Sequence, residues 1–517
     1  MKNNIIRALL LMLCCCMILG AFAGCQTTTP PNNGDGTDTS GGGDATDPNN
    51  GTTGEATTEE VTTEEPETEP VEELPEVQYN KEFVMYMRNT DYYISEQYIE
   101  ELSGQYSIVD AAVYFRNLAV EERFGVEIKI VKAAGGNTDT SAMESIKTNT
   151  CDHDVIVSHG RSMFTYAMNN TLVDWNDLPY VDLTKPWWNQ GMINDFTVNG
   201  VLYCLAGDIS YQSLGATLGM VFNKDVCDLL EMDYPYDLVL NNEWTWEEFK
   251  TMTEKAKQEL SGNDILNPED GDVMGYATCY WRGPMTVLYS GGGAIVSKND
   301  EGTELELTLY SARNERIFSD YFELLSQENN KLYNYGAYSV EGFHKTFAKG
   351  KVLFIDTRLY DIRYIIENNF ANYGVIPWPK YDEYVEEYYS WCDAVGNTFG
   401  VPRCHDKERL EYISVILEAL SAEGYREVMP TFYEDVLQAK YANDPDAFDC
   451  IDLIKAGRKY DIASYMQENM GAVSSPGPNL IDTTTGEFKD FSNWYSGVEG
   501  TAKQNLKLVN KLFELVT

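Results

Sequence analysis

The stretch DAAVYFRNLAVEERFGVEIKIV, residues 110–131, decides the fold class of this chain. Asp110 to Phe124 carries apolar side chains at helical spacing, at positions 111, 114, 115, 118 and 119. Gly125 follows as a natural helix terminator. From Val126 to Val131 apolar and polar side chains then alternate, as they do in a half-buried strand. The stretch therefore predicts a helix that runs directly into a strand.

Strand-like segments flank this unit on both sides. FVMYM, residues 83–87, alternates and ends in the polar loop Arg88-Asn89-Thr90. DVIV, residues 154–157, is a short apolar run of the kind that is buried in parallel sheets. Strands that alternate with helices predict an α/β fold with parallel pairing. Residues 81–517 are too many for a single core, so we expect two domains there.

A further helix start is predicted at TWEEF, residues 245–249. Thr245 can cap the helix and Glu248, three residues later, can complete a capping box. We therefore interpret Trp244 and Trp246 as structural rather than ligand-binding residues.

The N-terminus has the features of a lipoprotein signal peptide over residues 1–24. Lys2 and Arg7 precede an apolar run that ends in small residues, which is typical of secretion signals. Ala23-Gly24-Cys25 resembles the lipobox of bacterial lipoproteins, so we expect Cys25 to be lipidated. An ordinary signal peptide that is cut nearby is the alternative.

The segment from Cys25 to residue 80 is rich in Thr, Glu, Gly, Asp, Pro and Asn and contains no Lys or Arg. Such a composition cannot bury enough apolar surface to fold, so we expect a disordered acidic linker. The linker would hold a domain off the membrane surface. The whole chain has a formal net charge of −44, which argues against nucleic acid or anionic lipid as a partner.

The cysteines indicate neither a disulfide framework nor a zinc site. Seven follow Cys25, an odd number, and none is in a C-x-x-C pair. We expect most of them to be small buried side chains, with room for one or two disulfides. Cys151, His153 and His159 lie close in sequence, but their spacing fits no usual metal site. We expect no metal and no cofactor.

Common catalytic motifs are missing, whereas aromatic residues are abundant. The chain contains no G-x-S-x-G, H-E-x-x-H or G-x-x-x-x-G-K-[ST] sequence. It has 9 Trp, 35 Tyr and 20 Phe, several of them in predicted loops beside Arg, Asp or Asn, as in Tyr280-Trp-Arg282 and Trp391-Cys-Asp393. An aromatic face packs on the C–H surface of a sugar while polar neighbours satisfy its hydroxyls. We therefore favour carbohydrate binding over catalysis.

The order of motifs along the chain resembles the family 1 extracellular solute-binding proteins of ABC importers, the group that includes maltose-binding protein. The resemblance covers about residues 81–460. The matching stretches are 154–157 (DVIV), 199–203 (NGVLY), 207–208 (GD), 220–224 (MVFNK), 244–249 (WTWEEF), 347–354 (FAKGKVLF), 373–380 (YGVIPWPK) and 433–437 (YEDVL).

This resemblance implies a two-lobe α/β fold of the type II periplasmic-binding-protein kind, with an interlobe cleft and a hinge. Residues 81–517 would form this bilobal domain. Lobe 1 would comprise about 81–215 and 355–400, and lobe 2 about 223–354 with part of the C-terminal helical region. Hinge crossings would fall near Gly215–Asn223 and Phe354–Tyr360.

The resemblance also implies which residues bind ligand, because the family's cleft loops follow particular strands. Residues Ser158, Gly160 and Asp356 map to these loops, and our ligand-binding candidates are Arg88, Asn89, His159, Arg161, Asp208, Trp281, Arg282, Arg358 and Trp391. Arg161, Arg282 and Arg358 would suit an acidic sugar if all three face the cleft. Alternatively, they pair with the chain's own acidic residues, which is the interpretation we favour from sequence.

The function implied is a membrane-anchored extracellular receptor rather than an enzyme. It would capture a carbohydrate, an oligosaccharide in our interpretation, by lobe closure and deliver it to the transmembrane subunits of an ABC permease. We expect a monomer that is held by its lipid on the outer face of a Gram-positive-type cell membrane. A secreted hydrolase of surface glycans, or a sensory or adhesive lipoprotein of the same fold, are the alternatives.

Overall fold

The computed structural model describes residues 70–102, 106–135, 140–264, 266–333, 339–370, 372–433, 444–482 and 485–514. All of them belong to one compact unit, residues 68–517. The predicted signal peptide, Cys25 and most of the predicted linker lie outside the described residues. None of the helices in the described ranges is long and apolar enough to cross a membrane.

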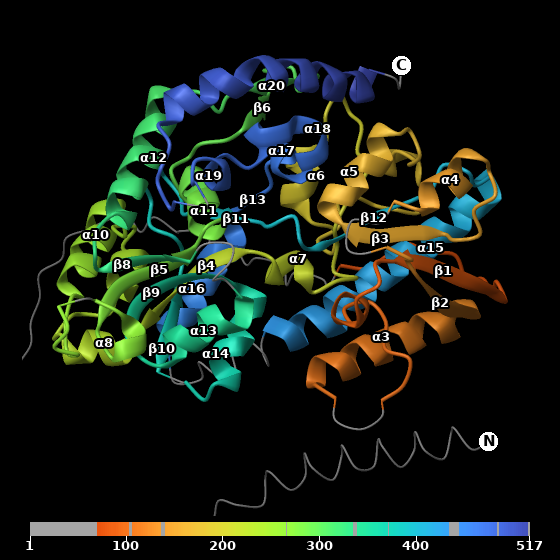
Figure 1. Ribbon diagram of the computed structural model, residues 1–517. Coiled ribbons are helices and arrows are strands. Elements are labelled where there is room, and N and C mark those ends of the chain that lie inside the picture. The colour runs from red at the N-terminus through yellow and green to blue at the C-terminus, as the bar shows by residue number, and fades with distance from the viewer. Residues whose placement is uncertain are drawn as a thin grey trace, which may run out of the picture. The chain divides into compact units, whose positions relative to one another are not determined.

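The first of two main sheets has four strands in the order β12–β3–β1–β2 (Figure 1). β1 pairs in parallel with β2 and β3, and β12 runs antiparallel to β3. The predicted strands at 83–87, 126–131 and 154–157 are thus confirmed as parallel neighbours. The strands are β1 (Lys81–Met87), β2 (Val126–Lys132), β3 (Val155–His159) and β12 (Asn397–Gly400).

The second main sheet has five strands in the order β10–β4–β9–β5–β8. β5 pairs in parallel with β8 and β9, whereas β4 runs antiparallel to both β9 and β10. Its strands are β4 (Leu218–Asn223), β5 (Met274–Cys279), β8 (Asn330–Tyr333), β9 (Val352–Arg358) and β10 (Tyr373–Ile376). Two mixed sheets, each with parallel and antiparallel pairs, and their connecting helices confirm the predicted α/β class.

Helices connect and cover these strands (Figure 1). Those that precede β4 are α2 (Asp91–Ile94), α3 (Ile108–Phe124), α4 (Ala142–Lys147), α5 (Gly160–Met168), η1 (Trp175–Asp177), α6 (Gln190–Phe196) and α7 (Gln212–Gly215). Those from β4 to β10 are α8 (Lys224–Leu229), α9 (Tyr236–Leu240), α10 (Trp246–Lys255), η2 (Pro268–Asp270), α11 (Arg282–Ser290), α12 (Ala312–Leu325), α13 (Val340–Ala348), η3 (Leu359–Ile362) and α14 (Arg363–Glu367).

The remaining elements are mostly C-terminal to β10. β6 (Val296–Lys298) and β7 (Leu305–Leu307) form a hairpin, and β11 (Ser390–Trp391) pairs in parallel with β13 (Arg458–Lys459). The later helices are α15 (Lys407–Glu423), η4 (Gly424–Val428), α16 (Pro445–Ala456), α17 (Ile462–Tyr465), α18 (Gln467–Met470), η6 (Gly471–Ser474), α19 (Pro476–Asn479) and α20 (Phe491–Glu514).

Helix α3 ends where the sequence predicts. Gly125 adopts a left-handed conformation with φ of 60°, which glycine reaches without steric cost. The helix begins at Ile108, because Ser107 and Asp110 form a reciprocal capping box. The fold-deciding stretch is therefore the α3–β2 unit.

The capping box predicted for α10 is wrong. Thr245 precedes the first helical residue, but its side chain makes no capping hydrogen bond. Thr245 instead forms a parallel bridge with Lys380, whose carbonyl accepts the Trp246 amide at 2.7 Å. Backbone pairing thus fixes the entry into this helix. Trp244 and Trp246 are buried, in line with their predicted structural role.

Within the described residues, three short segments connect elements of the two main sheets, and the sequence predicts only the first. The chain passes between them at Ala216–Thr217, within the expected crossing. Phe354–Tyr360 is not a crossing, because β9 continues through η3 and α14 into β10 of the same sheet. The return lies between β10 and β12, so residues 355–400 do not all belong to lobe 1. A third passage joins α16, which packs on β10, to α17, which packs on α5.

These crossing segments lie side by side. The Asp393 amide donates to the Ala216 carbonyl at 3.1 Å, and Thr217 bridges Cys392. The Cys392 amide in turn donates to the Lys459 carbonyl at 3.1 Å, next to the β11–β13 pair. The connection between the sheets is thus a narrow hydrogen-bonded ribbon.

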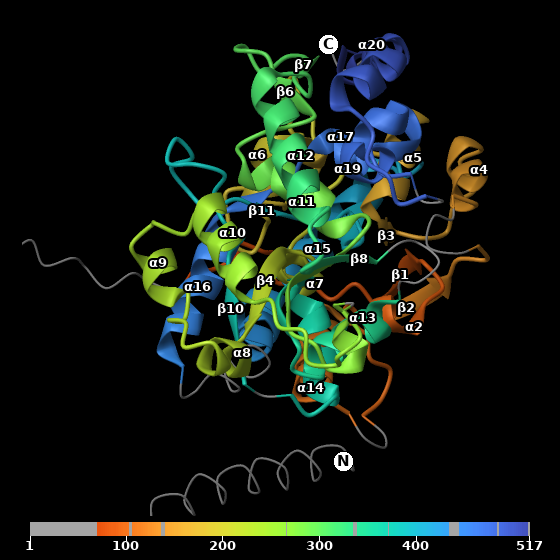
Figure 2. The same cartoon turned by 60° about the vertical axis from the view of Figure 1, so that its left-hand side comes forward.

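The C-terminal segment packs against elements of both sheets rather than only on lobe 2. α18 and α20 contact α5, which follows β3 of the first sheet. α19 contacts α11 and α20 contacts α12, and both of those partners follow strands or loops of the second-sheet region. Figure 2 shows α17 beside α5.

One disulfide is present among the described cysteines. Cys151, in the loop before β3, is bonded to Cys404, which follows β12. Five others are free and buried, as predicted: Cys204, Cys227, Cys279, Cys392 and Cys450.

The predicted linker extends too far, because residues 70–80 are fixed on the domain. The buried Glu72 carboxylate accepts from Arg123 Nη1 at 2.5 Å and from Arg426 Nη1 at 2.8 Å. The Tyr79 amide donates to the Phe124 carbonyl at 2.7 Å. Burial alone would raise the pKa of Glu72, but hydrogen bonds from Arg426, from its own backbone and from Arg123 lower that pKa to about 2.

We predict that Glu72→Gln lowers the free energy of unfolding by about 1–3 kcal/mol at pH 7, because Arg123 and Arg426 lose the buried carboxylate that they share. The wild-type carboxylate stabilises the fold above its unfolded pKa, ordinarily 4.5, and this contribution is lost as pH falls towards 2. Glu72→Gln should therefore lose less stability than wild type over that interval.

Urea denaturation at several pH values measures both effects. Glu73→Gln, at the exposed neighbouring position, is the matched control and should behave like wild type. Equal stability of Glu72→Gln and Glu73→Gln would contradict the anchoring role.

Candidate functional site

Four arginines lie at the carboxyl ends of strands from both main sheets, and we call them the arginine cluster. Arg88 follows β1 and Arg161 is the second residue of α5, after β3. Arg282 opens α11, shortly after β5, and Arg358 ends β9. The carboxyl ends of strands are where α/β proteins place their ligand sites. All four residues were predicted as ligand-binding.

One carboxylate, that of Asp361, holds the two arginines of the second sheet. Arg282 Nη2 lies 2.6 Å and Arg358 Nε 2.7 Å from Asp361 Oδ2. Burial alone would raise the pKa of Asp361, but Arg358, Arg282 and His344 lower it to about 2. Asp361 is therefore ionised at physiological pH.

A second carboxylate, that of Asp393, links the two sheets. Arg358 Nη1 lies 3.5 Å from Asp393 Oδ2, and Arg161 Nη2 lies 3.9 Å from Oδ1. Asp393 belongs to the crossing ribbon, through its bond to Ala216. The interpretation that Arg161, Arg282 and Arg358 pair with the chain's own acidic residues is thus confirmed.

Arg88 and His159 also lie at the ends of first-sheet strands, β1 and β3. Arg88 Nη2 donates to the Val395 carbonyl at 2.8 Å, and its guanidinium lies 3.2 Å from the centre of the Tyr93 ring. His159 Nδ1 accepts from the Arg161 amide at 3.3 Å. Burial, and then Arg88, Arg161 and Arg358, lower the pKa of His159 well below 6.5. The imidazole is therefore neutral at physiological pH.

Aromatic rings continue from the arginine cluster. The Trp281 ring centre lies 5.0 Å from the Arg282 guanidinium and 5.8 Å from that of Arg358. Trp391 meets Trp281 edge to face at 6.3 Å and stacks on Tyr289 at 6.1 Å. We call Trp281, Trp391 and Tyr289 the aromatic row. Trp391 is buried, and its Nε1 has no hydrogen-bond partner in the described part of the chain.

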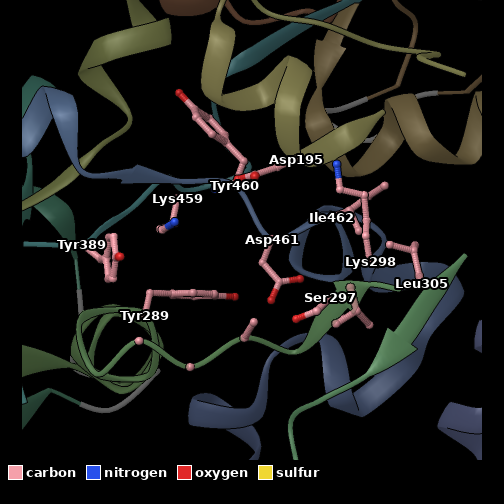
Figure 3. A pocket seen from close by; sticks show the side chains of 14 residues that line it. Asp195, Tyr289, Ser297, Lys298, Leu305, Tyr389, Lys459, Tyr460, Asp461 and Ile462 are labelled. Atoms are coloured by element: carbon pink, nitrogen blue, oxygen red, sulfur yellow. Dashed lines mark hydrogen bonds between the residues drawn. The ribbon is translucent and has the colours of Figure 1, made fainter. Parts of the chain in front are cut away.

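The row ends at a cavity of about 300 Å³ (Figure 3). Tyr289 and Tyr389 line one part of it, and the segment Lys459–Ile462 after the crossing lines another. Asp461 accepts from the Ile295 amide at 2.6 Å, and burial raises its pKa to about 7. Lys459 Nζ lies 4.3 Å from the centre of the Tyr389 ring. The cavity thus combines aromatic faces with charged groups of both signs.

Sequence reasoning did not identify the residues of this cavity. Lys459–Ile462 falls in the C-terminal part of the chain, near or beyond the end of the motif resemblance. Tyr289 precedes Gly291-Gly-Gly293, which without a Lys-Ser/Thr successor indicates only a loop. The sequence features that could have indicated this cavity are Tyr289 and the glycine residues that follow it.

Solvent reaches the cluster unevenly. The Arg161 side chain is 32% exposed and that of Arg358 13%, whereas Arg282 is fully buried. Asn89 is exposed next to Arg88. Asn89 was predicted to bind ligand, but no contact described for it joins it to the cluster.

Asp208 does not belong with the other predicted residues. It is close to Ser213, whose hydroxyl donates to it at 3.4 Å, and to Lys455 and Arg458. Burial raises the pKa of Asp208 to about 7, although the positive charges of Arg458 and Lys455 act to lower it. The Gly207-Asp208 turn pairs with Trp188, and Asp208 lines a different cavity together with Ser213, Lys455 and Arg458.

The other mapped residues are structural neighbours of the cluster. Asp356 is buried and accepts from the Tyr276 hydroxyl at 2.9 Å. Ser158 is buried and its carbonyl accepts from Thr398. A Cβ at Gly160 would lie 2.4 Å from the Tyr465 ring, so only glycine fits there.

One group in the described ranges has the composition of a metal site, namely Cys151, Cys404 and His405. The two sulfurs are bonded to each other, so neither is a free thiolate. His153 and His159, considered with Cys151 in the sequence, are not part of this group.

Comparison with known proteins supplies a family and a fold. The family model for bacterial extracellular solute-binding proteins matches residues 119–431, more than half of the chain. Among curated proteins, none matches this chain in sequence.

Two solved structures share the architecture. An ABC substrate-binding protein of Listeria monocytogenes, in complex with cycloalternan, aligns with a TM-score of 0.53 at 13% identity, over 82% of this chain and 99% of its own. The GacH receptor of Streptomyces glaucescens, solved unliganded and with acarbose, aligns with a TM-score of 0.50 at 13% identity, over 85% and 100%. The likeness confirms the predicted two-lobe fold.

We predict that Asp361→Asn destabilises the protein by about 3–5 kcal/mol, because it leaves two arginines without their shared carboxylate in a buried place. Chemical denaturation at pH 7 measures the change. Asp233→Asn, at an exposed position, removes the same charge and should change stability little. A stability of Asp361→Asn equal to that of this control would show that the ion pair contributes nothing.

Proposed function

Because the chain belongs to the bacterial extracellular solute-binding protein family, we propose that it captures a carbohydrate between its two lobes and delivers it to the transmembrane subunits of an ABC permease. The observation that carries this proposal is the meeting of polar and aromatic side chains from both sheets at the ends of their strands. A ligand held there touches both lobes at once.

The crossing ribbon supports closure of the lobes around the ligand. Hinge motions are absorbed by a few residues in connecting segments. Here the ribbon consists of short segments, Ala216–Thr217, the β11 region and the β13 region, which are hydrogen-bonded to one another. Asp393 in this ribbon pairs with an arginine of each lobe, so closure and ligand contact involve the same residues.

The aromatic row supports a carbohydrate as the solute. Trp281 is partly exposed and presents a ring beside guanidinium donors, which suits the C–H face and the hydroxyls of a sugar. The two solved relatives of this fold are bound to cycloalternan and to acarbose. A saccharide is therefore the class to test first.

We further propose that lipidated Cys25 anchors the protein on the outer face of the cell membrane, with the acidic segment up to about residue 69 as a spacer. Ala23-Gly24-Cys25 supports this anchor. We propose that the receptor acts as a monomer.

We predict that a saccharide raises the unfolding temperature of the purified chain in a thermal-shift panel of mono- and oligosaccharides, uronic acids and peptides. A ligand specific for the folded state adds about 2.7 kcal/mol to the free energy of unfolding at a hundredfold excess over its Kd.

Trp281→Ala should weaken binding of that saccharide by about tenfold. Trp494→Ala, which removes a tryptophan on α20, is the control and should bind as wild type.

Two results would contradict the receptor proposal. Binding of peptides alone would exclude a carbohydrate solute. If chromatography of the mixture showed that the bound saccharide is consumed, this result would instead support the secreted glycan hydrolase.

The anchor makes a separate prediction. Cells that express the wild-type chain should incorporate a labelled fatty acid into it, and Cys25→Ser should abolish this labelling. Cys16→Ser, which alters a cysteine of the predicted signal peptide, is the control. Continued labelling of Cys25→Ser would refute the anchor.

A further inference from the structure

We propose that the saccharide carries a carboxylate and that Arg161 is the residue that pairs with it. The inference rests on the function proposed above, because it names the chemical class of the ligand of that same site. A uronic acid unit within an oligosaccharide is the group that meets this description.

The ion pairs described for Arg161, Arg282 and Arg358 join these three guanidinium groups to two carboxylates, Asp361 and Asp393. His159, which lies among these arginines, is neutral. A carboxylate on the ligand would therefore add a third negative partner to these described pairs.

Among these arginines, Arg161 is held least firmly. Its distance to Asp393 is 3.9 Å, whereas Arg282 and Arg358 lie 2.6 and 2.7 Å from Asp361. Its Nε is buried and has no hydrogen-bond acceptor within the described part of the chain. Its side chain is nevertheless 32% exposed, so a ligand can reach the guanidinium. A guanidinium group presents its N–H donors as a fork that binds a carboxylate with two hydrogen bonds.

Two further acidic residues near the cluster act on other arginines. Glu96 faces Arg88, and burial raises its pKa to about 7 despite hydrogen bonds from Ser210 and Gln97. Asp356 faces Arg282, and burial raises its pKa to about 6. Neither carboxyl forms a described ion pair with Arg161. The positive charge of Arg161 is therefore balanced mainly by the Asp393 carboxylate, 3.9 Å away.

The surroundings of Arg161 suit an acidic sugar rather than a bare anion. Arg358, which shares Asp393 with it, also lies over the Trp281 ring. A pyranose against the exposed part of the Trp281 side chain would place a carboxylate near the two guanidinium groups. The whole chain is strongly acidic, at −44, so an acidic solute would be attracted to this cationic site rather than to the rest of the surface.

Titration calorimetry of the purified full chain, at one fixed low ionic strength, tests the inference. The probes are oligosaccharides of galacturonate, of mannuronate and of a glucuronate-containing glycan, each beside its carboxyl-reduced, neutral counterpart. We expect one acidic probe to bind at least about tenfold more tightly than its neutral counterpart, as a charged hydrogen-bonded pair would give.

Variants then assign the contact. Arg161→Gln should weaken the acidic probe by about 10- to 100-fold while leaving the neutral counterpart unchanged. Arg316→Gln removes the same charge from an exposed position on α12 and should leave both affinities at their wild-type values. The comparison of acidic and neutral probes uses wild-type protein, so it does not depend on the folding of a variant.

The possible failures are distinguishable. Equal or tighter binding of the neutral counterparts overturns the acidic ligand and leaves the carbohydrate receptor intact. Preference for an acidic probe that Arg161→Gln does not change overturns the role of Arg161. Binding of no saccharide, acidic or neutral, contradicts this inference together with the proposed function.

Discussion

Burial of arginine charge where the two sheets meet is the constraint on which the rest of the structure depends. A buried guanidinium group requires carboxylate partners, since an unpaired charge of this kind is very costly to bury. Asp361 meets this need within the second sheet. Asp393 meets it between the sheets, from a backbone position in the crossing ribbon. The electrostatics of the site and the connection of the lobes are thus joined in one residue.

That arrangement accounts for other features of the site. The neutral state of His159 follows from burial beside Arg88, Arg161 and Arg358. The Trp281 ring accommodates guanidinium groups on its face, and Trp391 and Tyr289 extend the apolar path to the neighbouring cavity. Each of these side chains touches another member of the set, so the arginine cluster and the aromatic row form one continuous group of contacts.

Local patterns in the sequence predict much of the fold. The α3–β2 unit follows from helical spacing, a terminating glycine and strand alternation, all of which are local. The apolar positions used to predict α3 are not its buried side, however, which carries Val113, Val120 and Phe124. The course of the chain after β9 could not be predicted in this way, because membership of β10 in the second sheet depends on pairing with β4, about 150 residues earlier. Thr245 likewise has the right neighbours for a cap, yet a distant Lys380 carbonyl determines the helix start.

The same distinction applies to the site. Arg88, Arg161 and Arg358 were chosen by the family resemblance, and the structure places them at strand ends, which converge in this fold class. Asp208, chosen by position in a turn, lies elsewhere. The cavity residues Lys459–Ile462 come from the third crossing, which no local pattern marks.

A crystal structure of the full chain with a bound saccharide tests the central claim most directly. Our account predicts the sugar between the two lobes, in contact with Trp281 and with arginines of both sheets, Arg161 and Arg358. A saccharide that is bound to one lobe alone, with the Arg161–Asp393–Arg358 arrangement untouched, would contradict it.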